Sequence, residues 1–228
     1  MEKKKFLVLD VETANDVNCP LVYDLGFAVC DKYGKIYEKQ SMLIYEVYRG
    51  ERELMNSCYY ANKIPEYEEQ IKRGETKIVR FFTAWKIIRD TMKKYNIDTI
   101  AAYNCNFDRN ALNNTIRYLT KSEYRWFFPY NTKYMCIWHM ACQVIYTQKT
   151  FQKWAKKNSF VSVSGNIQTS AEIGHRYYTG NTNFQEEHKG LQDVIIECGI
   201  MAKCFAQHKS MKRGINRLCW KIPQKVTA

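Results

Sequence analysis

The sequence predicts one α/β domain in which a mixed sheet is flanked by helices. Two observations carry this prediction: apolar runs of strand length come first, and a further strand then alternates with segments of helical periodicity. A chain of 228 residues is long enough for one sizeable core with some embellishments. The segments are taken below in chain order.

The chain opens with three predicted strands. Residues 5–11 form a short apolar run rich in branched side chains, which is typical of a buried strand. Residues 22–30 and 35–46 are two more strand candidates, and the segment 31–34 (Asp-Lys-Tyr-Gly) between them has the composition of a hairpin turn. We therefore expect an antiparallel meander, and a fourth strand at 98–103.

Helical periodicity dominates the remainder of the chain. Apolar residues recur at helical spacing from Ile78 to Tyr95, with Lys and Arg largely between them. A second helix is expected at 106–118, shorter ones at 134–147, 150–157 and 169–178, and a final strong helix from Gly190 to about residue 205. Residues 47–75 and 121–165 are the segments where we expect insertions or loops.

We expect one domain at 1–207 and a basic C-terminal tail at 208–228. The tail carries six Lys and Arg residues around Trp220. It could track a nucleic-acid backbone or dock a partner, and as a run of charges it could equally be solvated.

Composition indicates an intracellular protein with a surplus of positive charge. The net charge is +12, which fits either a soluble surface or a polyanionic partner. The nine cysteines form no C-x-x-C pair, so we expect them to be reduced and expect no zinc site. The apolar run after the charged start is too short for a signal peptide, and no stretch approaches a membrane span. We therefore expect a cytoplasmic protein.

The first acidic motif follows the first apolar run. Asp10 and Glu12 are two residues apart on a strand, so both side chains project to the same side. Two carboxylates on one face at the end of a strand can grip a hard divalent cation. Asp-x-Glu alone is common by chance, and its position directly after Phe-Leu-Val-Leu is what gives it weight.

The second motif lies at the start of a helix. Asp108 falls in the first turn after the fourth strand, Asn104 can cap that helix, and Phe107 can fill the core beneath it. A carboxylate here gains from the helix dipole, and that gain alone would explain an Asp at this position.

The third motif flanks the start of the last helix. His188 and Asp193 stand on either side of Lys189-Gly190, close enough to reach one site from a loop. Histidine is the side chain best suited to accept a proton near neutral pH. The alternative is a surface histidine. His139, His175 and His208 lack this acidic and glycine context, and we expect them to be ordinary helix or tail residues.

Together the three motifs resemble those of the DEDDh exonucleases, the DnaQ-like branch of the ribonuclease H fold. The matching residues are Asp10, Glu12 and Thr13 in the first motif, Asn104, Phe107 and Asp108 in the second, and His188 and Asp193 in the third. The resemblance spans roughly residues 5–205, and the stretch 169–188 more narrowly resembles stand-alone exonucleases of phages and bacteria.

The resemblance implies a sheet of an antiparallel meander followed by parallel strands, and a 3′–5′ exonuclease that releases 5′-mononucleotides, with DNA favoured. It implies that Asp10, Glu12, Asp108 and Asp193 hold two divalent cations, Mg²⁺ or Mn²⁺, and that His188 is the general base. Thr13, Asn104 and Phe107 would contact the substrate, a single-stranded or frayed 3′ end. A polymerase or another replication protein is a candidate partner, with a role in proofreading.

Two positions depart from the family pattern. Tyr103 stands where many members begin the second motif with His, and no glycine follows Asp10-Val-Glu-Thr13, where Asn15 and Asp16 stand nearby. Both departures concern the shape of the pocket for the 3′-terminal nucleotide, and neither removes a carboxylate.

Two alternatives for function remain. One is an RNA-trimming exoribonuclease of the same fold, and the other is a catalytically idle nucleic-acid-binding or polymerase-accessory domain. Additional acidic residues could lie near the site or on solvated helix faces: Glu172, Glu186, Glu187 and Glu197. A cluster of aromatic residues could stack on bases or belong to a core or an interface: Trp126, Phe127, Phe128 and Tyr130.

Overall fold

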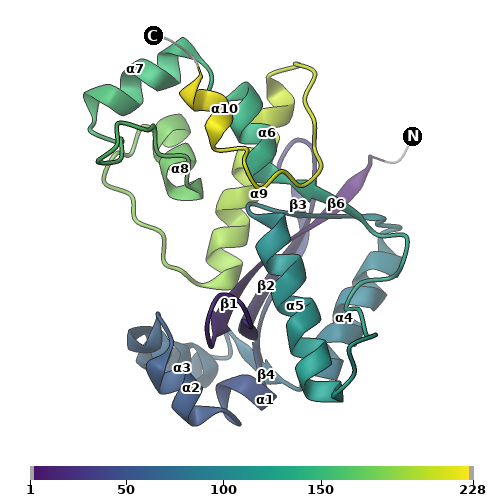
Figure 1. Cartoon of the computed structure of the whole chain (residues 1–228). Coiled ribbons are helices and arrows are strands. Elements are labelled where there is room, and N and C mark those ends of the chain that lie inside the picture. Colours follow the sequence, from purple (N-terminus) through teal and green to yellow (C-terminus); the bar gives the residue numbers. More distant parts are fainter. Residues whose placement is uncertain (1–2, 226–228) are drawn as a thin grey trace.

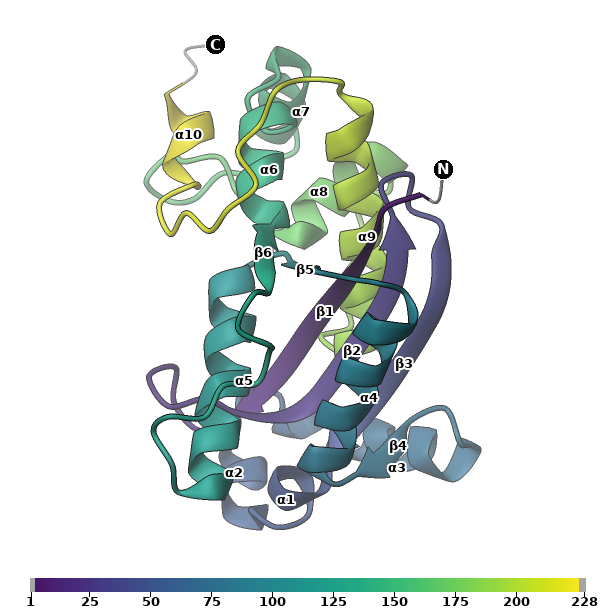
Figure 2. The same cartoon turned by 90° about the vertical axis from the view of Figure 1, so that its right-hand side faces the viewer.

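A six-stranded mixed sheet forms the centre of the molecule (Figure 2). The structure is a computed structural model and describes residues 3–225. The strands are β1 (Lys5–Ala14), β2 (Leu21–Asp31), β3 (Ile36–Ile44), β4 (Lys77–Val79), β5 (Thr99–Ala102) and β6 (Lys133–Cys136). Their order across the sheet is β4-β3-β2-β1-β5-β6. The first three strands are antiparallel, while β4, β5 and β6 each run parallel to their neighbour, so the predicted fold class is confirmed.

Helices cover both faces of this sheet (Figure 1). They are α1 (Tyr45–Tyr48), α2 (Arg52–Ser57), the 3₁₀ helix η1 (Ala61–Lys63), α3 (Ile64–Arg73), α4 (Phe81–Lys94), α5 (Cys105–Thr120), α6 (Ile137–Val144), α7 (Lys149–Lys157), α8 (Ala171–Thr179), α9 (Gly190–Ala206) and α10 (Lys221–Gln224). In Figure 2, α4 and α5 lie in front of the strands and α9 lies behind them. Among the described residues, no helix combines the length and apolar character that a membrane crossing requires.

The alternation of side chains along β1 divides the core into two layers. Leu7 and Leu9 pack with residues of α4 and α5 on one face. Phe6 and Val8 point to the other face and pack with residues of α6 and α9. Asp10 and Glu12 continue the row of Phe6 and Val8 by the same alternation, so they end up on the side of the sheet that carries α9.

The structure corrects four sequence expectations. Residues 134–147 do not form one helix, because β6 occupies 133–136 and α6 starts at Ile137. The helix predicted from Ile78 starts at Phe81, since Ile78 and Val79 pair with β3 in the short strand β4. A short apolar run fits a strand or a helix equally well, which explains both differences. The segment 47–75 folds largely into short helices, and the strand expected at 35–46 ends at Ile44, where α1 begins.

The described part of the predicted basic tail packs against α6. Cys219 is fully buried, and Met211 and Ile222 contact the core layer of α6 and α9. The carbonyl of Arg213 accepts a hydrogen bond from the Cys136 amide at 2.7 Å, and that of Gly214 lies 2.7 Å from Nδ1 of His139. Apolar residues and backbone groups therefore attach the segment to the domain, while its charges remain outside.

Candidate active site

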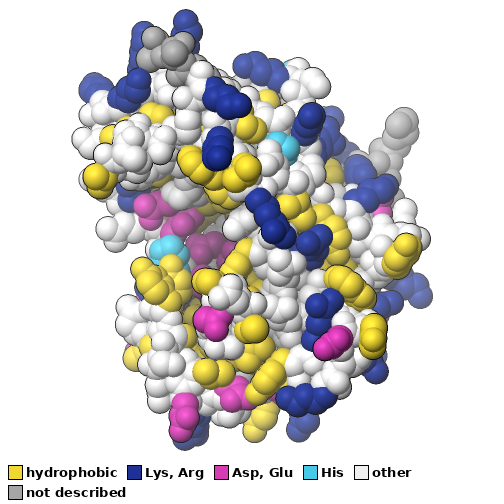
Figure 3. Space-filling view, in the orientation of Figure 1, with side chains coloured by type: hydrophobic (Ala, Val, Ile, Leu, Met, Phe, Trp, Pro, Cys, Tyr) yellow, Lys and Arg dark blue, Asp and Glu magenta, His cyan; other side chains and the backbone are white. Residues whose placement is uncertain are grey.

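A cleft of about 270 Å³ opens where β1 ends, between α5, α9 and the start of α8. Figure 3 shows acidic side chains gathered in a hollow on this face of the molecule, with a histidine beside them. The lining residues come from segments far apart in sequence: Asp10, Val11, Glu12, Tyr60, Tyr103, Asn104, Phe107, Asp108, Ser170, Ala171, Glu186, His188, Asp193 and Glu197. The structure thus brings together all four predicted carboxylates and His188.

Asp10 and Glu12 lie in an environment that opposes their ionisation. Burial raises the pKa of Asp10 well above its usual range, and the nearby charges of Glu197 and Asp108 raise it further. Burial, followed by repulsion from Asp24 and other carboxylates, raises the pKa of Glu12 to about 9. In the absence of a counter-charge, burial and mutual repulsion therefore favour the protonated form of both carboxyls.

Asp108 reaches the cleft from the first turn of α5. The residue is buried, and burial raises the pKa of its carboxyl to about 7, against hydrogen bonds from the backbone of Asp108 and Val11 that lower it. Asn104 occupies the N-cap position, but its side chain makes no capping hydrogen bond, contrary to the expectation that it caps the helix. Asn104 lines the cleft instead, and Phe107 both lines the cleft and packs against the core layer of α4 and α5, as expected.

The start of α9 is held against the sheet by two glycines. A Cβ on Gly26 of β2 would lie 2.1 Å from the carbonyl carbon of Gly190, and one on Gly190 would lie 2.6 Å from the Gly26 nitrogen. The Gly190 amide also donates to Oδ2 of the buried Asp24, at 3.0 Å. This close approach brings His188 and Asp193 beside Asp10 and Glu12.

His188 is fixed by its backbone and by a ring contact. Its φ of +50° lies in the left-handed region, and its ring stacks on that of Tyr60 with 4.6 Å between centroids. A nitrogen of His188 and carboxylate oxygens of Glu12 and Asp193 all lie within 4.8 Å of one another. Burial lowers the pKa of His188, so the ring is neutral, and able to accept a proton, near pH 7.

Similarity to known proteins was found at the level of structure. No protein-family model matches the sequence, and no curated protein gives a significant match. A complex of E. coli exonuclease I with a 5cy-dT13 oligonucleotide superimposes with a TM-score of 0.52 at 12% identity, over 91% of this chain and 41% of that one. The zinc-bound complex of E. coli exonuclease I with single-stranded DNA gives the same values.

The chain has an exonuclease I-like fold. A product-bound structure of exonuclease I agrees, with a TM-score of 0.50 at 12% identity over 87% of this chain and 42% of that one. The chain therefore spans about two-fifths of the length of these proteins. At this identity the similarity establishes the ribonuclease H-like exonuclease fold and leaves the activity to be argued from the site.

Two further acidic residues lie in or next to the cleft: Glu197, which the sequence offered as a residue either near the site or on a solvated helix face, and Asp24, which it did not single out. Glu197 lies four residues after Asp193 on α9, is buried, and has one carboxylate oxygen without a hydrogen-bond partner. Asp24 stands opposite Glu12 in the β1–β2 register and accepts a hydrogen bond from Tyr67 at 2.8 Å. The i, i+4 spacing of Asp193 and Glu197 was a usable signal, whereas the pairing of Glu12 with Asp24 depends on strand register.

The remaining residues that the sequence offered as site candidates differ in whether they line the cleft. Glu186 lines the cleft, and its amide donates to Glu172, which also pairs with Arg176 at 2.8 Å. Glu187 is exposed and lies 3.5 Å from Lys189. Thr13, which was expected to contact the substrate, is not among the residues that line the cleft, and an irregularity in the β1–β2 register falls between Glu12 and Thr13.

The hydroxyl of Tyr103 forms hydrogen bonds within the protein. Its hydroxyl interacts with that of Tyr146 and donates to the carbonyl of Thr169, each at 2.5 Å. The side chain therefore ties β5 to the start of α8, and its buried ring forms one wall of the cleft.

Proposed function

We propose that this chain is a metal-dependent 3′–5′ exonuclease that releases 5′-mononucleotides, with DNA as the favoured substrate. One observation carries the proposal: five carboxylates from β1, α5 and α9 converge with His188 in one cleft. Burying that many acids is unfavourable unless a cation accompanies them. A domain that only binds nucleic acid gains nothing from such an arrangement.

The side chains fit a divalent cation. One carboxylate oxygen of Asp193 and one of Glu197 are buried without a hydrogen-bond partner. Asp10, Glu12, Asp108 and Asp193 would hold two ions, and their oxygen ligands suit Mg²⁺ or Mn²⁺. When bound, such ions supply an activated water and stabilise the charge that develops on the phosphate and the leaving oxygen.

His188 would act as the general base. Its ring is held by the stacking contact with Tyr60, and its depressed pKa keeps it unprotonated at neutral pH. A base in this state can take a proton from a water molecule that attacks the terminal phosphate. Asn104 and Phe107 line the same cleft and would contact the 3′-terminal nucleotide.

A nucleic-acid substrate agrees with the charge of the chain and with its structural neighbours. The net charge of +12 favours a polyanion, and the exonuclease I structures that share the fold were solved with single-stranded DNA or an oligonucleotide. This likeness favours DNA over RNA and a single-stranded over a duplex end.

The test is a digestion of matched single-stranded DNA and RNA, with Mg²⁺, with Mn²⁺ and with excess chelator. The proposal predicts metal-dependent release of mononucleotides, faster from DNA. Faster digestion of RNA would favour the exoribonuclease alternative. If the protein binds the DNA and the RNA but digests neither, the result would favour the catalytically idle binding domain. The Asp10→Asn protein, purified in parallel, controls for contaminating nucleases.

A further inference from the structure

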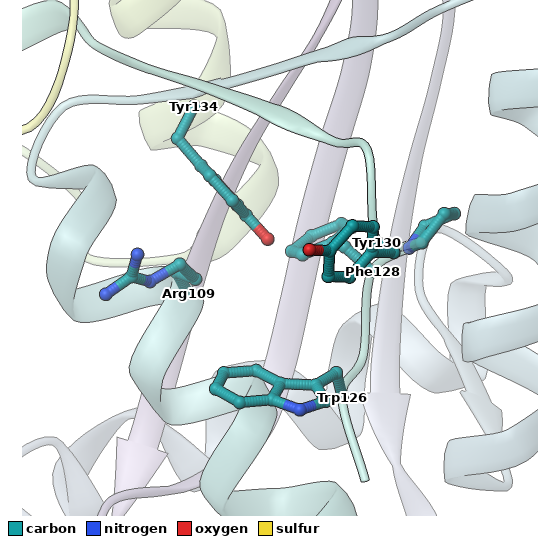
Figure 4. Close-up of a pocket in the computed structure, with 6 residues that line it drawn as sticks. Arg109, Trp126, Phe128, Tyr130 and Tyr134 are labelled. Carbon is teal, nitrogen blue, oxygen red and sulfur yellow. The ribbon is translucent and has the colours of Figure 1, made fainter.

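An aromatic pocket of about 340 Å³ lies beside the start of α5 (Figure 4). It is lined by Arg109, Trp126, Phe128, Pro129, Tyr130 and Tyr134. Asp108 belongs to the cleft and the next residue, Arg109, belongs to the pocket. The two sites therefore share the start of one helix.

The rings around the pocket are left open to solvent. Trp126 is 62% exposed and Tyr130 is fully exposed, although both are large aromatic residues. Phe128 is buried and makes an edge contact with Tyr134 at 5.9 Å, which gives the pocket a fixed wall. In Figure 4, Arg109 and Tyr130 lie on opposite sides of the gap, and Trp126 lies below it. Open aromatic faces of this kind are the platforms on which single-stranded bases stack.

Two guanidinium groups accompany these rings. Arg109 lies over the ring of Tyr134 at 5.4 Å and has a buried Nε without a hydrogen-bond partner. Arg117, two turns further along α5, lies over the ring of Trp126 at 4.5 Å. Cations beside stacking rings complement a base with its phosphate better than they complement an apolar protein segment.

We propose that this pocket binds an upstream nucleobase of the single strand whose 3′ end occupies the acidic cleft. The inference rests on the proposed function, because the cleft defines which end of the strand is held. The shared start of α5 puts the pocket within reach of the same strand, and the stacked base would hold that strand in place while its terminal nucleotide is removed.

The experiment compares Trp126→Ala and Tyr130→Ala with a matched control, Tyr33→Ala, whose side chain is 65% exposed in the hairpin between β2 and β3. The dissociation constant of a labelled twelve-nucleotide single-stranded DNA is measured in chelator, which prevents cleavage. We expect it to rise roughly 5- to 100-fold in the pocket variants and to stay near the wild-type value in Tyr33→Ala. Trp126→Phe keeps an aromatic face and should restore most of the affinity.

Hydrolysis supplies a second readout. With metal present, we compare the ratio of the Trp126→Ala KM to the wild-type KM for two substrates. The ratio should be larger for the twelve-nucleotide strand than for a dinucleotide, which is too short to reach the pocket. Unchanged dissociation constants in both pocket variants would overturn the inference and would favour a role of this surface in binding a protein partner. If wild type cleaves neither substrate while the variants still lose affinity, the proposed exonuclease function fails and the base-binding pocket stands.

Discussion

Asp108→Asn should stabilise the metal-free protein at alkaline pH. The carboxyl is buried, and its pKa is raised from 3.8 to about 7. A folded-state pKa above the unfolded value means that the folded protein binds the proton more tightly. Stability is therefore fully present below pH 3.8 and is lost as the pH rises toward 7. Asparagine keeps the shape and one acceptor oxygen but removes this loss.

The size of the effect follows from the shift. A rise in the pKa from 3.8 to about 7 corresponds to about 4 kcal/mol of folding free energy. The carboxyls of the cleft titrate together, so the effects of neutralising several of them would not sum. For a chain of this size the difference amounts to roughly 10 °C in Tm.

The assay is thermal unfolding in chelator from pH 4 to pH 8.5, followed by circular dichroism. Asp98→Asn is the control with the opposite sign, because the ion pair with Lys133 at 2.7 Å holds the pKa of Asp98 below its usual range. Its carboxylate stabilises the fold above the unfolded pKa, and its loss should cost a little stability at high pH. Parallel pH profiles for wild type and Asp108→Asn would refute the argument that burial raises the pKa of the Asp108 carboxyl in the metal-free protein.

Three further substitutions probe the site. Asp10→Asn should abolish hydrolysis and leave the circular dichroism spectrum unchanged, and residual metal-dependent activity would contradict the assigned role. His188→Ala should lose about 10²- to 10⁴-fold in rate and lose the limb of the pH profile that rises through the His titration. Calorimetric metal titrations of His188→Ala should match those of wild type, and weaker metal binding by this variant would indicate that His188 is a metal ligand. Gly190→Ala places a Cβ 2.6 Å from the Gly26 nitrogen. It should cost about 1–3 kcal/mol of stability and, if the start of α9 moves by about 1 Å, about 10²-fold in rate. Gly214→Ala, whose Cβ meets nothing within 4 Å, should do neither.

The sequence was sufficient for the features that depend on local periodicity. Alternation along β1 predicted that Asp10 and Glu12 share one face. The helical pattern that follows the strand β5 predicted that Asp108 lies in the first turn of α5. The stripe of apolar residues in α9 was also visible in the sequence, and it begins directly after the loop that carries His188.

Features that depend on long-range pairing were not predictable in this way. The stacking of Tyr60 on His188 requires the helical segment that follows β3, which looks like an insertion in the sequence. The role of Asp24 requires the register of β1 with β2, and the contact of Gly26 with Gly190 requires the packing of α9 on the sheet. None of these contacts leaves a periodic trace in the chain.

The most direct test of the central claim is a time course with single-stranded DNA labelled at the 3′ end in one reaction and at the 5′ end in another. A metal-dependent 3′–5′ exonuclease releases the 3′ label at once as a mononucleotide and shortens the 5′-labelled strand in single-nucleotide steps, and chelator stops both. Early internal fragments, or release that continues in excess chelator, would contradict the assignment of the acidic cleft to this reaction.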